Sequence, residues 1–433
     1  MAATGWTSRR TVVSRSRRTE TPTGVVRKHH GDRLIVVFTA LLMLIGLLVI
    51  YAIGPQRANL MNSVFGFQYS EGYFFWKQLL SLVLALLAFW GISLVPYTFI
   101  VKHGSKVLWL GFISCALLAI GGWTGAIEGT NGAVRWIELG PLGSVQPAEI
   151  LKFGVLLYMA SFLAMRSKEG KINDVRETLI PAAIVAGAAL FFVIVIQKDL
   201  GTGMSLTAIV AMMLFMAGVN RRVIASIVGI LVIAGLFLIF TSPHRVERVM
   251  TYLQGDNTST SDADAYHIQH AKIAIGSGGL FGVGIGDSVQ ASGYLPEAIN
   301  DSIFAIIGET FGFVGTVALI ALFVALLMRL LGVMDHMIDQ RLKLIAAGVF
   351  GWLGAHVILN IAAMIGIFPL TGITLPLLSY GGTSMIFMAA ALGLVFQISK
   401  YTVHSSRIKE ATNENSRSGR GVGRTRYASR RSA

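Results

Sequence analysis

Asp301 is the residue whose position most strongly suggests chemistry. It ends the stretch Gly-Tyr-Leu-Pro-Glu-Ala-Ile-Asn-Asp at 293–301, and an apolar run of helical length begins soon after it. A carboxylate at the edge of such a run stays near water, whereas the same charge inside a bilayer would be costly. Asp301 could therefore act as a general base at a membrane surface. The competing interpretation is that Asp301 only caps the helix that follows.

Charged side chains also gather in the segment 131–152. Gln146 and a following proline predict a helix start with proline in the first helical position. Glu149 and Lys152 would then share one face of that helix at i, i+3 spacing. They form either an ion pair that eases the helix into the membrane or, with Arg135, a cationic surface for a phosphate.

Two other segments interrupt the apolar pattern. Residues 197–202 predict a tight turn in which Asp199 caps the next helix or contributes to a site. Residues 368–384 are broken by prolines and glycines, and broken backbone at membrane depth is tolerated only where protein or a wet cavity satisfies it. The glycine-rich stretch 274–286 lacks the Gly-Lys-Ser/Thr ending of a phosphate-binding loop.

Composition places these segments on a polytopic membrane protein. Hydrophobic residues make up 54% of the 433 positions and charged residues only 13%, which excludes a soluble domain of this size. Most apolar segments approach the ~20 residues that cross a bilayer. We therefore predict an all-α protein with ten transmembrane helices, at 34–54, 78–96, 107–121, 149–165, 179–196, 203–219, 222–241, 303–331, 342–366 and 383–399.

The distribution of basic residues predicts the orientation. Of the 36 Lys and Arg residues, 28 fall on the face that carries both chain ends, so both termini are expected in the cytoplasm. The predicted organisation is a basic cytoplasmic tail at 1–33, helices at 34–241, an extracytoplasmic loop at 242–302, helices at 303–400 and a second basic tail at 401–433.

The tails carry most of the net charge of +14. Such segments cannot build a core, and they are expected to anchor the topology through anionic lipid or to bind a cytoplasmic partner. Nucleic-acid binding is excluded because the basic residues lie beside membrane spans without interleaved aromatic residues. Within the spans, Gly308 and Gly312 predict a helix contact face, and Cys115, the single cysteine, is expected to be a packing residue.

Four segments, in chain order and on one membrane face, resemble the SEDS family of bacterial cell-wall proteins, which includes FtsW and RodA. They are 131–152, 197–202, the loop 242–302 with its glycine-rich stretch and Asp301, and 368–384. The resemblance covers about residues 34 to 400. It implies a protein of the bacterial cytoplasmic membrane that polymerises lipid II into peptidoglycan glycan strands. It also implies a class B penicillin-binding protein as crosslinking partner, together with other divisome or elongasome membrane proteins.

The resemblance assigns roles residue by residue. The essential loop carboxylate of the family falls on Asp301. The family's binding motifs fall on Arg135, Trp136, Gln146, Pro147, Glu149, Lys152, Asp199, Glu297, Ser379, Gly381 and Gly382. The chain departs from the family pattern at Lys198, Ser302 and Thr310, and the last of these leaves the role of Glu309 open.

The implied chemistry is glycosyl transfer with inversion. Asp301 would accept the proton of the acceptor hydroxyl. Fixed cations would stabilise the departing diphosphate. The candidates for that second role are Arg135, Lys152, Arg245 and Arg248.

The sequence indicates no cofactor with certainty. The loop 242–302 holds more acidic than basic residues, which is unfavourable for an anionic substrate. A divalent cation, Mg²⁺ or Mn²⁺, between carboxylate and diphosphate would compensate. No metal-ligand spacing is visible, however, and His244, His267 and His270 are expected at the surface.

Two other functions are compatible with these features. A lipid II flippase should place polar residues near the bilayer midplane, whereas here charged residues concentrate at the outer ends of the helices. A non-catalytic scaffold that recruits a transpeptidase is the other alternative. Between family branches, 274–288 followed by Leu-Pro-Glu favours the division type and hence the septum, while Tyr-His-Ile-Gln at 266–269 favours the elongation type.

Overall fold

The computed structural model describes residues 30–127, 134–138, 140, 143–240 and 263–402, and side chains at 231–240 and 263–264 are not described. This part of the chain is predominantly helical. Its only strands are β1 (Ile137–Glu138) and β2 (Ser144–Val145), which pair as a short antiparallel hairpin. The all-α prediction is therefore confirmed, and the hairpin is an addition that the sequence did not predict.

All ten predicted spans are helical. They are α1 (Arg33–Phe65), α2 (Tyr73–Leu94), α4 (Gly104–Trp123), α5 (Pro147–Lys168), η2–α6–η3 (Val175–Ile196), α7 (Leu200–Ala217), α8 (Arg221–Phe240), α11 (Ile303–Asp335), α12 (Gln340–Met364) and α13 (Gly382–Ile398). Within the described residues, nine of them, all except α8, are long and apolar enough to cross a membrane. Shorter helices are α3 (Tyr97–Lys102) and α10 (Ala263–Ser277), with single turns η5 (Gln290–Ser292) and η6 (Ser399–Tyr401).

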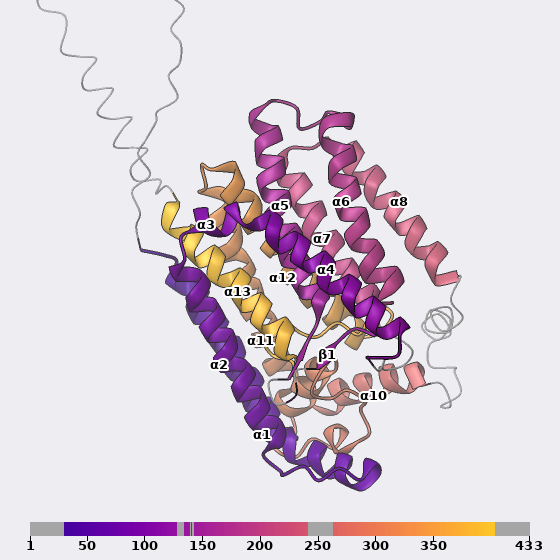
Figure 1. Cartoon of the computed structure of the whole chain (residues 1–433). Helices are drawn as coiled ribbons and strands as arrows, with labels where there is room; N and C mark the ends of the chain where they lie inside the picture. Colours follow the sequence, from indigo (N-terminus) through magenta and orange to yellow (C-terminus); the bar gives the residue numbers. More distant parts are fainter. Residues whose placement is uncertain (1–29, 128–133, 139, 141–142, 241–262, 403–433) are drawn as a thin grey trace, which may run out of the picture.

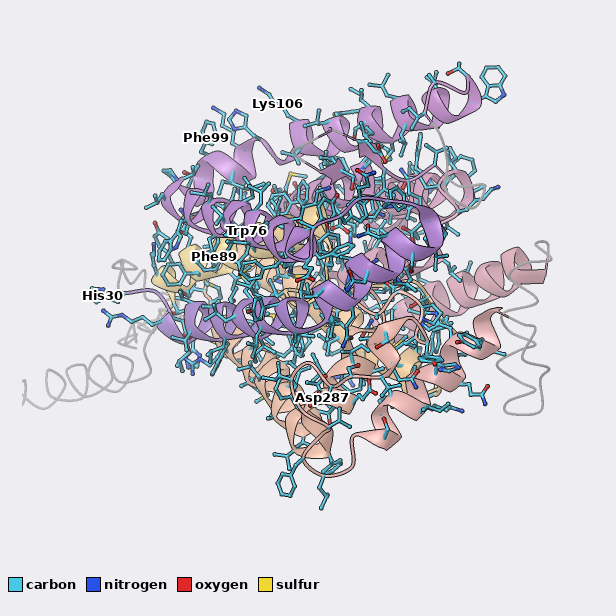
Figure 2. The ribbon with its side chains drawn as sticks, turned by 90° about the horizontal axis from the view of Figure 1, so that it is seen from below. His30, Trp76, Phe89, Phe99, Lys106 and Asp287 are labelled. Atoms are coloured by element: carbon cyan, nitrogen blue, oxygen red, sulfur yellow. The ribbon has the colours of Figure 1, made fainter. Side chains whose placement is uncertain are left out.

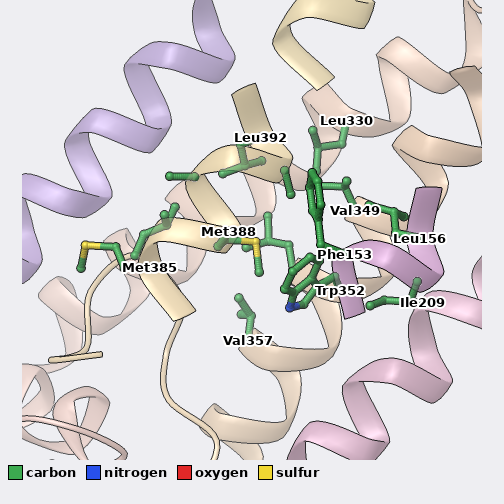
Figure 3. Close-up of a cluster of buried hydrophobic side chains, with 14 of the residues drawn as sticks. Phe153, Leu156, Ile209, Leu330, Val349, Trp352, Val357, Met385, Met388 and Leu392 are labelled. Atoms are coloured by element: carbon green, nitrogen blue, oxygen red, sulfur yellow. The ribbon is translucent and has the colours of Figure 1, made fainter. Parts of the chain in front are cut away.

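Three helices form the centre of the bundle. Most of α5, α12 and α13 is buried, whereas α2, α4 and α6 are mainly exposed at the periphery. Figure 3 shows apolar side chains of α5, α7, α11, α12 and α13 meeting around Trp352, which is fully buried. The predicted packing role of Cys115 is confirmed, since its side chain is buried within α4.

Both described ends of the chain lie on one face. The backbone N–H of Asp32 donates to Ser399 Oγ at 2.8 Å, and the Asp32 carboxylate accepts from Arg329 Nε at 2.9 Å. Figure 1 shows these ends at the opposite end of the bundle from β1 and α10. A chain that starts and finishes on the same face crosses an even number of times, which agrees with ten spans.

Helix α11 is broken near its start. Gly312 has φ 66° and ψ −162°, a conformation that essentially only glycine adopts. The loop 278–284 pairs with the backbone on both sides of the break. Val283 and Gly284 donate to the carbonyls of residues 309 and 310, and the N–H groups of residues 313 and 314 donate to the carbonyls of residues 279 and 280.

Glycine makes this close approach possible. A Cβ at Gly282 would lie 2.1 Å from the carbonyl oxygen of Thr310, and a Cβ at Gly312 would lie 2.4 Å from the N of Gly282. Gly308 packs against Ile275 of α10. The predicted contact face of Gly308 and Gly312 is thus confirmed, and its partner is α10 with the loop that follows it.

Gly312→Ala is expected to destabilise the protein by about 1–3 kcal/mol or more, because it combines a glycine-only conformation with a backbone clash. The matched control is Gly332→Ala in the same helix, where an added Cβ meets nothing within 4 Å. That change should be neutral or slightly stabilising. Thermal unfolding of both variants in detergent measures the difference, and equal melting temperatures would contradict the account of the break.

Candidate active site

The backbone of Asp301 is held by a buried amide in α12. Asn360 Nδ2 donates to the carbonyl oxygen of Asp301 at 2.7 Å and to that of Ile373, also at 2.7 Å. The Asn360 side chain is 1% exposed. One amide group therefore ties the loop that ends at Asp301 to the segment between α12 and α13.

The same two segments are joined at two more points. Ser379 Oγ donates to the carbonyl oxygen of Asn300 at 2.7 Å and accepts from Leu375 N at 2.8 Å. Tyr380 N donates to the carbonyl oxygen of Ile299 at 2.8 Å. Ser379 is buried, so its predicted role as a direct substrate contact is not visible in this geometry. Its hydroxyl instead fixes the backbone beside Asp301.

The carboxylate of Asp301 lies at the junction of these segments. The residue is partly exposed, and its Oδ2 lies 3.7 Å from the point where a Cβ on Gly372 would stand. The N-cap position of α11 is Ser302, whose own side chain makes no capping hydrogen bond. Asp301 is therefore the residue before the N-cap and not the N-cap itself, and its role as a base stays a prediction.

Ser302 and two histidines of α10 form hydrogen bonds within the loop that leads to Asp301. Ser302 Oγ is buried; it donates to the carbonyl oxygen of Pro296 at 2.8 Å and lies 2.6 Å from His267 Nε2. His270 Nδ1 lies 2.7 Å from Gln290 Oε1. The expectation that these two histidines lie at the surface is met only in part, because both have intermediate exposure and are hydrogen-bonded to the loop. His244 lies outside the described residues.

Glu309 fixes residues 288–290 of the loop between α10 and α11. Its carboxylate is buried and accepts from Ser288 Oγ at 2.5 Å, Val289 N at 3.0 Å and Gln290 N at 3.2 Å. A buried carboxylate is stable only when it is well hydrogen-bonded, and here three donors converge on it. The role of Glu309, left open by the sequence, is to clamp the turn that precedes the Leu-Pro-Glu motif.

Glu149 and Lys152 form a buried ion pair on α5. Lys152 Nζ lies 2.7 Å from Glu149 Oε1, with side chains 0% and 2% exposed, and 4.7 Å from the centre of the Trp352 ring. The predicted pair is confirmed. Lys152 is not presented to the outside in this structure, so a direct contact with substrate stays a prediction.

His356 links this pair to the segment beside Asp301. Its Nε2 lies 3.5 Å from Lys152 Nζ, and its Nδ1 lies 3.4 Å from the carbonyl oxygen of Thr374. These neighbours suit a neutral ring that carries its proton on Nδ1, because ammonium groups only donate and carbonyls only accept. Both contacts are long. These polar groups nevertheless form one connected series from Glu149 through Lys152 and His356 to Thr374.

A second polar group forms around the turn after η3. Asp199 caps α7 by accepting from Thr202 N at 2.9 Å, and it also accepts from Gln146 Nε2 at 3.0 Å. Arg135 donates to the carbonyl oxygens of Gln197 at 3.2 Å and Lys198 at 2.7 Å. The predicted cap at Asp199 is thus confirmed, and Arg135 positions the turn that contains it.

This turn touches the segment beside Asp301. A Cβ on Gly201 would lie 2.7 Å from the carbonyl oxygen of Thr371 and 2.6 Å from Ile373 Cγ1. The segment 371–380 therefore contacts both the Asp199 turn and the Asp301 loop. Three of the four segments singled out in the sequence meet directly, and the fourth joins them through Gln146 and Arg135.

The remaining candidates lie at the margin or beyond the described chain. Trp136 and Glu297 are exposed, and Gly381 and Gly382 form the start of α13. Arg245 and Arg248 lie outside the described residues. Among the residues that are described, no three His, Cys, Asp or Glu side chains are placed to hold a metal ion.

His356 and Asn360 were not among the residues predicted from the sequence to belong to the site. Both lie inside the predicted span at 342–366. A signal was present, since the two residues are spaced i, i+4 and so share one helix face. Polar side chains within a span indicate function or a buried partner. Here they connect α12 to the segment beside Asp301.

Comparison with known proteins shows the family of this chain. The family model for FtsW, RodA and SpoVE, described as a cell cycle protein, matches residues 32–404. The chain belongs to this family. One relative is Stage V sporulation protein E of Bacillus subtilis (strain 168), 32% identical over 379 residues, which cover 87% of this chain and 99% of the relative.

Other members of the FtsW/RodA/SpoVE family show the same extent of similarity. A relative named "Probable peptidoglycan glycosyltransferase FtsW" from Methylococcus capsulatus (strain ATCC 33009 / NCIMB 11132 / Bath) is 34% identical over 342 residues, which cover 78% of this chain and 83% of the relative. Rod shape determining protein RodA of Thermus thermophilus has a crystal structure that superposes with a TM-score of 0.62 at 25% identity, covering 87% of this chain and 98% of RodA.

A chain from a structure of a peptidoglycan synthase complex shares the fold. It superposes with a TM-score of 0.66 at 24% identity, and the match covers 85% of this chain and 97% of that chain. The family assignment suggested by the four sequence segments is therefore confirmed, and this chain is a multi-pass membrane protein of that family.

Proposed function

We propose that this chain is a peptidoglycan glycosyltransferase that polymerises lipid II at the outer face of the cytoplasmic membrane. The observation that carries the proposal is the placement of Asp301, partly exposed at the start of α11 with its backbone fixed by Asn360. The names of relatives support it, since several are described as probable peptidoglycan glycosyltransferases.

The proposed step is an inverting transfer. The acceptor hydroxyl oxygen attacks the anomeric carbon of the lipid-linked sugar, and the bond from that carbon to the diphosphate oxygen breaks. The electron pair leaves with the diphosphate, and the hydroxyl proton moves to the Asp301 carboxylate. Holding reactants and base in register supplies much of the rate advantage of such a step, which explains a rigidly fixed loop.

Positive charge would stabilise the departing diphosphate. Arg135 is the described candidate at the outer end of the bundle, and two of its N–H groups already hold the turn at 197–198. Arg245 and Arg248 remain candidates by sequence. Lys152 would contact the diphosphate directly only if its ion pair with Glu149 opened. With the pair closed, Lys152 would act indirectly, by ordering α5 against α12.

A divalent cation fits this site only as an ion shared with the substrate. No cluster of three ligand side chains exists in the described residues, and Mg²⁺ commonly binds one or two carboxylates together with phosphate oxygens and water. Asp301 would be the protein ligand of such an ion, whether Mg²⁺ or Mn²⁺. The ion would neutralise charge on the diphosphate.

A crosslinking partner and a division role complete the proposal. The structurally similar chain comes from a complex that coordinates polymerization and crosslinking, which supports a class B penicillin-binding protein as partner.

We place both termini in the cytoplasm because basic residues accumulate on that face. The division septum is the proposed site of action, and a fluorescent fusion spread along the side wall would contradict it.

Reconstitution in vesicles separates polymerisation from transport. Vesicles that contain the chain, its partner and fluorescent lipid II are sampled for glycan by gel electrophoresis and for lipid II orientation by a membrane-impermeant quencher. We expect glycan on the outward-facing side without faster lipid II exchange between leaflets. Rapid exchange without glycan would support a flippase. Neither activity, with the complex intact, would support a scaffold.

Asn360→Leu tests whether the anchor of Asp301 matters for turnover. It removes both donated hydrogen bonds at nearly constant volume, and a misplacement on the order of 1 Å can cost about 100-fold in rate. We expect kcat to fall by about 10- to 100-fold with a smaller change in KM.

The matched control for Asn360→Leu is Gln78→Leu. Gln78 is equally buried but donates only a 3.4 Å bond, to the carbonyl oxygen of Ser379. This variant should retain most of the wild-type kcat. Equal losses in the two variants would mean that Asn360 has a general packing role.

A further inference from the structure

The loop between α10 and α11 exposes an apolar surface outside the transmembrane helices. Leu280 is 64% exposed, Phe281 80% and Ile285 54%. No charged residue occurs between Lys272 and Asp287. An extracytoplasmic loop in water normally carries polar side chains at its tip, so this composition needs a non-aqueous surrounding.

Backbone polar groups of this loop form hydrogen bonds with protein, which backbone inside a membrane requires. The amides of Val283 and Gly284 and the carbonyls at 279 and 280 all pair with the interrupted helix α11. Irregular backbone at hydrocarbon depth is tolerated only where protein satisfies its polar groups. The break at Gly312 supplies those partners.

The length of α11 places these pairs inside the hydrocarbon. Arg329 pairs with Asp32 at the face where the chain ends lie, so it marks the other boundary of the bilayer. Gly312 stands roughly 17 residues earlier, or about 26 Å along the helix, and the hydrocarbon core is about 30 Å thick. A tilted helix would bring Gly312 deeper still. Next to the break, Phe313 and Val314 are also exposed and apolar.

We propose that residues 279–285 form a re-entrant segment that inserts into the outer leaflet and contacts the acyl chains of the bilayer. Its exposed apolar tip, its charge-free sequence and its pairing with α11 all follow from that position. The segment continues through Asp287 to the turn that Glu309 clamps, and from there to Asp301. The catalytic loop is thus anchored in the lipid phase as well as in the protein.

Cysteine labelling tests this position, because the only native cysteine is buried. In a Cys115→Ala background, Phe281→Cys is labelled with an environment-sensitive fluorophore and the protein is placed in phosphatidylglycerol–phosphatidylcholine nanodiscs. Ile113→Cys, 54% exposed in the middle of α4, is the lipid reference. Asp287→Cys, on the loop between α10 and α11 and labelled in Figure 2, is the water reference.

We expect the probe at 281 to be quenched by acyl-chain nitroxide lipids as strongly as the probe at 113. Its quenching constant for aqueous iodide should be roughly tenfold below that at 287. Iodide quenching equal to that at 287 would overturn the proposal. Protection from both quenchers would also overturn it, because the segment would then be covered by protein. Gel filtration confirms that each labelled variant is folded.

Discussion

Asp301→Asn is expected to insert, fold and pair with its partner normally, yet to polymerise lipid II about 100- to 10,000-fold more slowly. The amide has almost the same shape as the carboxylate but cannot accept a proton at neutral pH. Because Asp301 is partly exposed and asparagine is nearly isosteric with aspartate, stability should change by less than ~1 kcal/mol. Initial rates of glycan formation and a thermal melt measure the two effects separately.

Asp287→Asn is the matched control for this prediction. It makes the same chemical change on an exposed residue of the same loop, away from the backbone contacts of Asn360 and Ser379. The control should polymerise at the wild-type rate. If Asp301→Asn were as active as Asp287→Asn, Asp301 would have a structural role only.

Lys152→Met is expected to destabilise the protein by about 3–5 kcal/mol, the usual cost of leaving one partner of a buried ion pair uncompensated. Lys152 and Glu149 are almost completely buried, and the pair is close at 2.7 Å. A flexible apolar side chain fills the lysine volume but offers no charge to the carboxylate. Thermal unfolding in detergent should show a melting temperature several degrees below wild type.

The double variant Lys152→Met/Glu149→Gln separates charge from packing. Replacing both members of a buried pair by well-packed hydrophobic residues is often neutral for stability, and glutamine likewise leaves no uncompensated charge. The double variant should therefore recover most of the loss. If the single and double variants melted alike, the loss would come from packing against Trp352 and not from the unpaired carboxylate.

The helical spans could be predicted from sequence because nine of them are long apolar runs within the described residues, and hydrophobic length is a direct requirement of the bilayer. The cap at Asp199 and the ion pair of Glu149 with Lys152 were predictable too, because both depend on spacing within one helix. These features are local, so they can be predicted from residues that are close together in the sequence.

The contacts that build the site are not local. Asn360 reaches Asp301 and Ser379 reaches Asn300 across separations of 59 and 79 residues. A single sequence gives no direct sign of such pairs. The same reason hid the pairing of the loop at 279–284 with the broken helix. Glycines in that loop were visible as a pattern, but their purpose depends on a partner backbone close by.

The most direct test of the account is the size distribution of products made from labelled lipid II by the purified chain with its transpeptidase partner. A β-lactam added to the reaction blocks crosslinking, so that only glycan length is measured. We expect a ladder of lengthening glycan strands that is absent when Asp301→Asn replaces the wild type. Unchanged lipid II with an intact wild-type complex, or an equal ladder from both proteins, would contradict it.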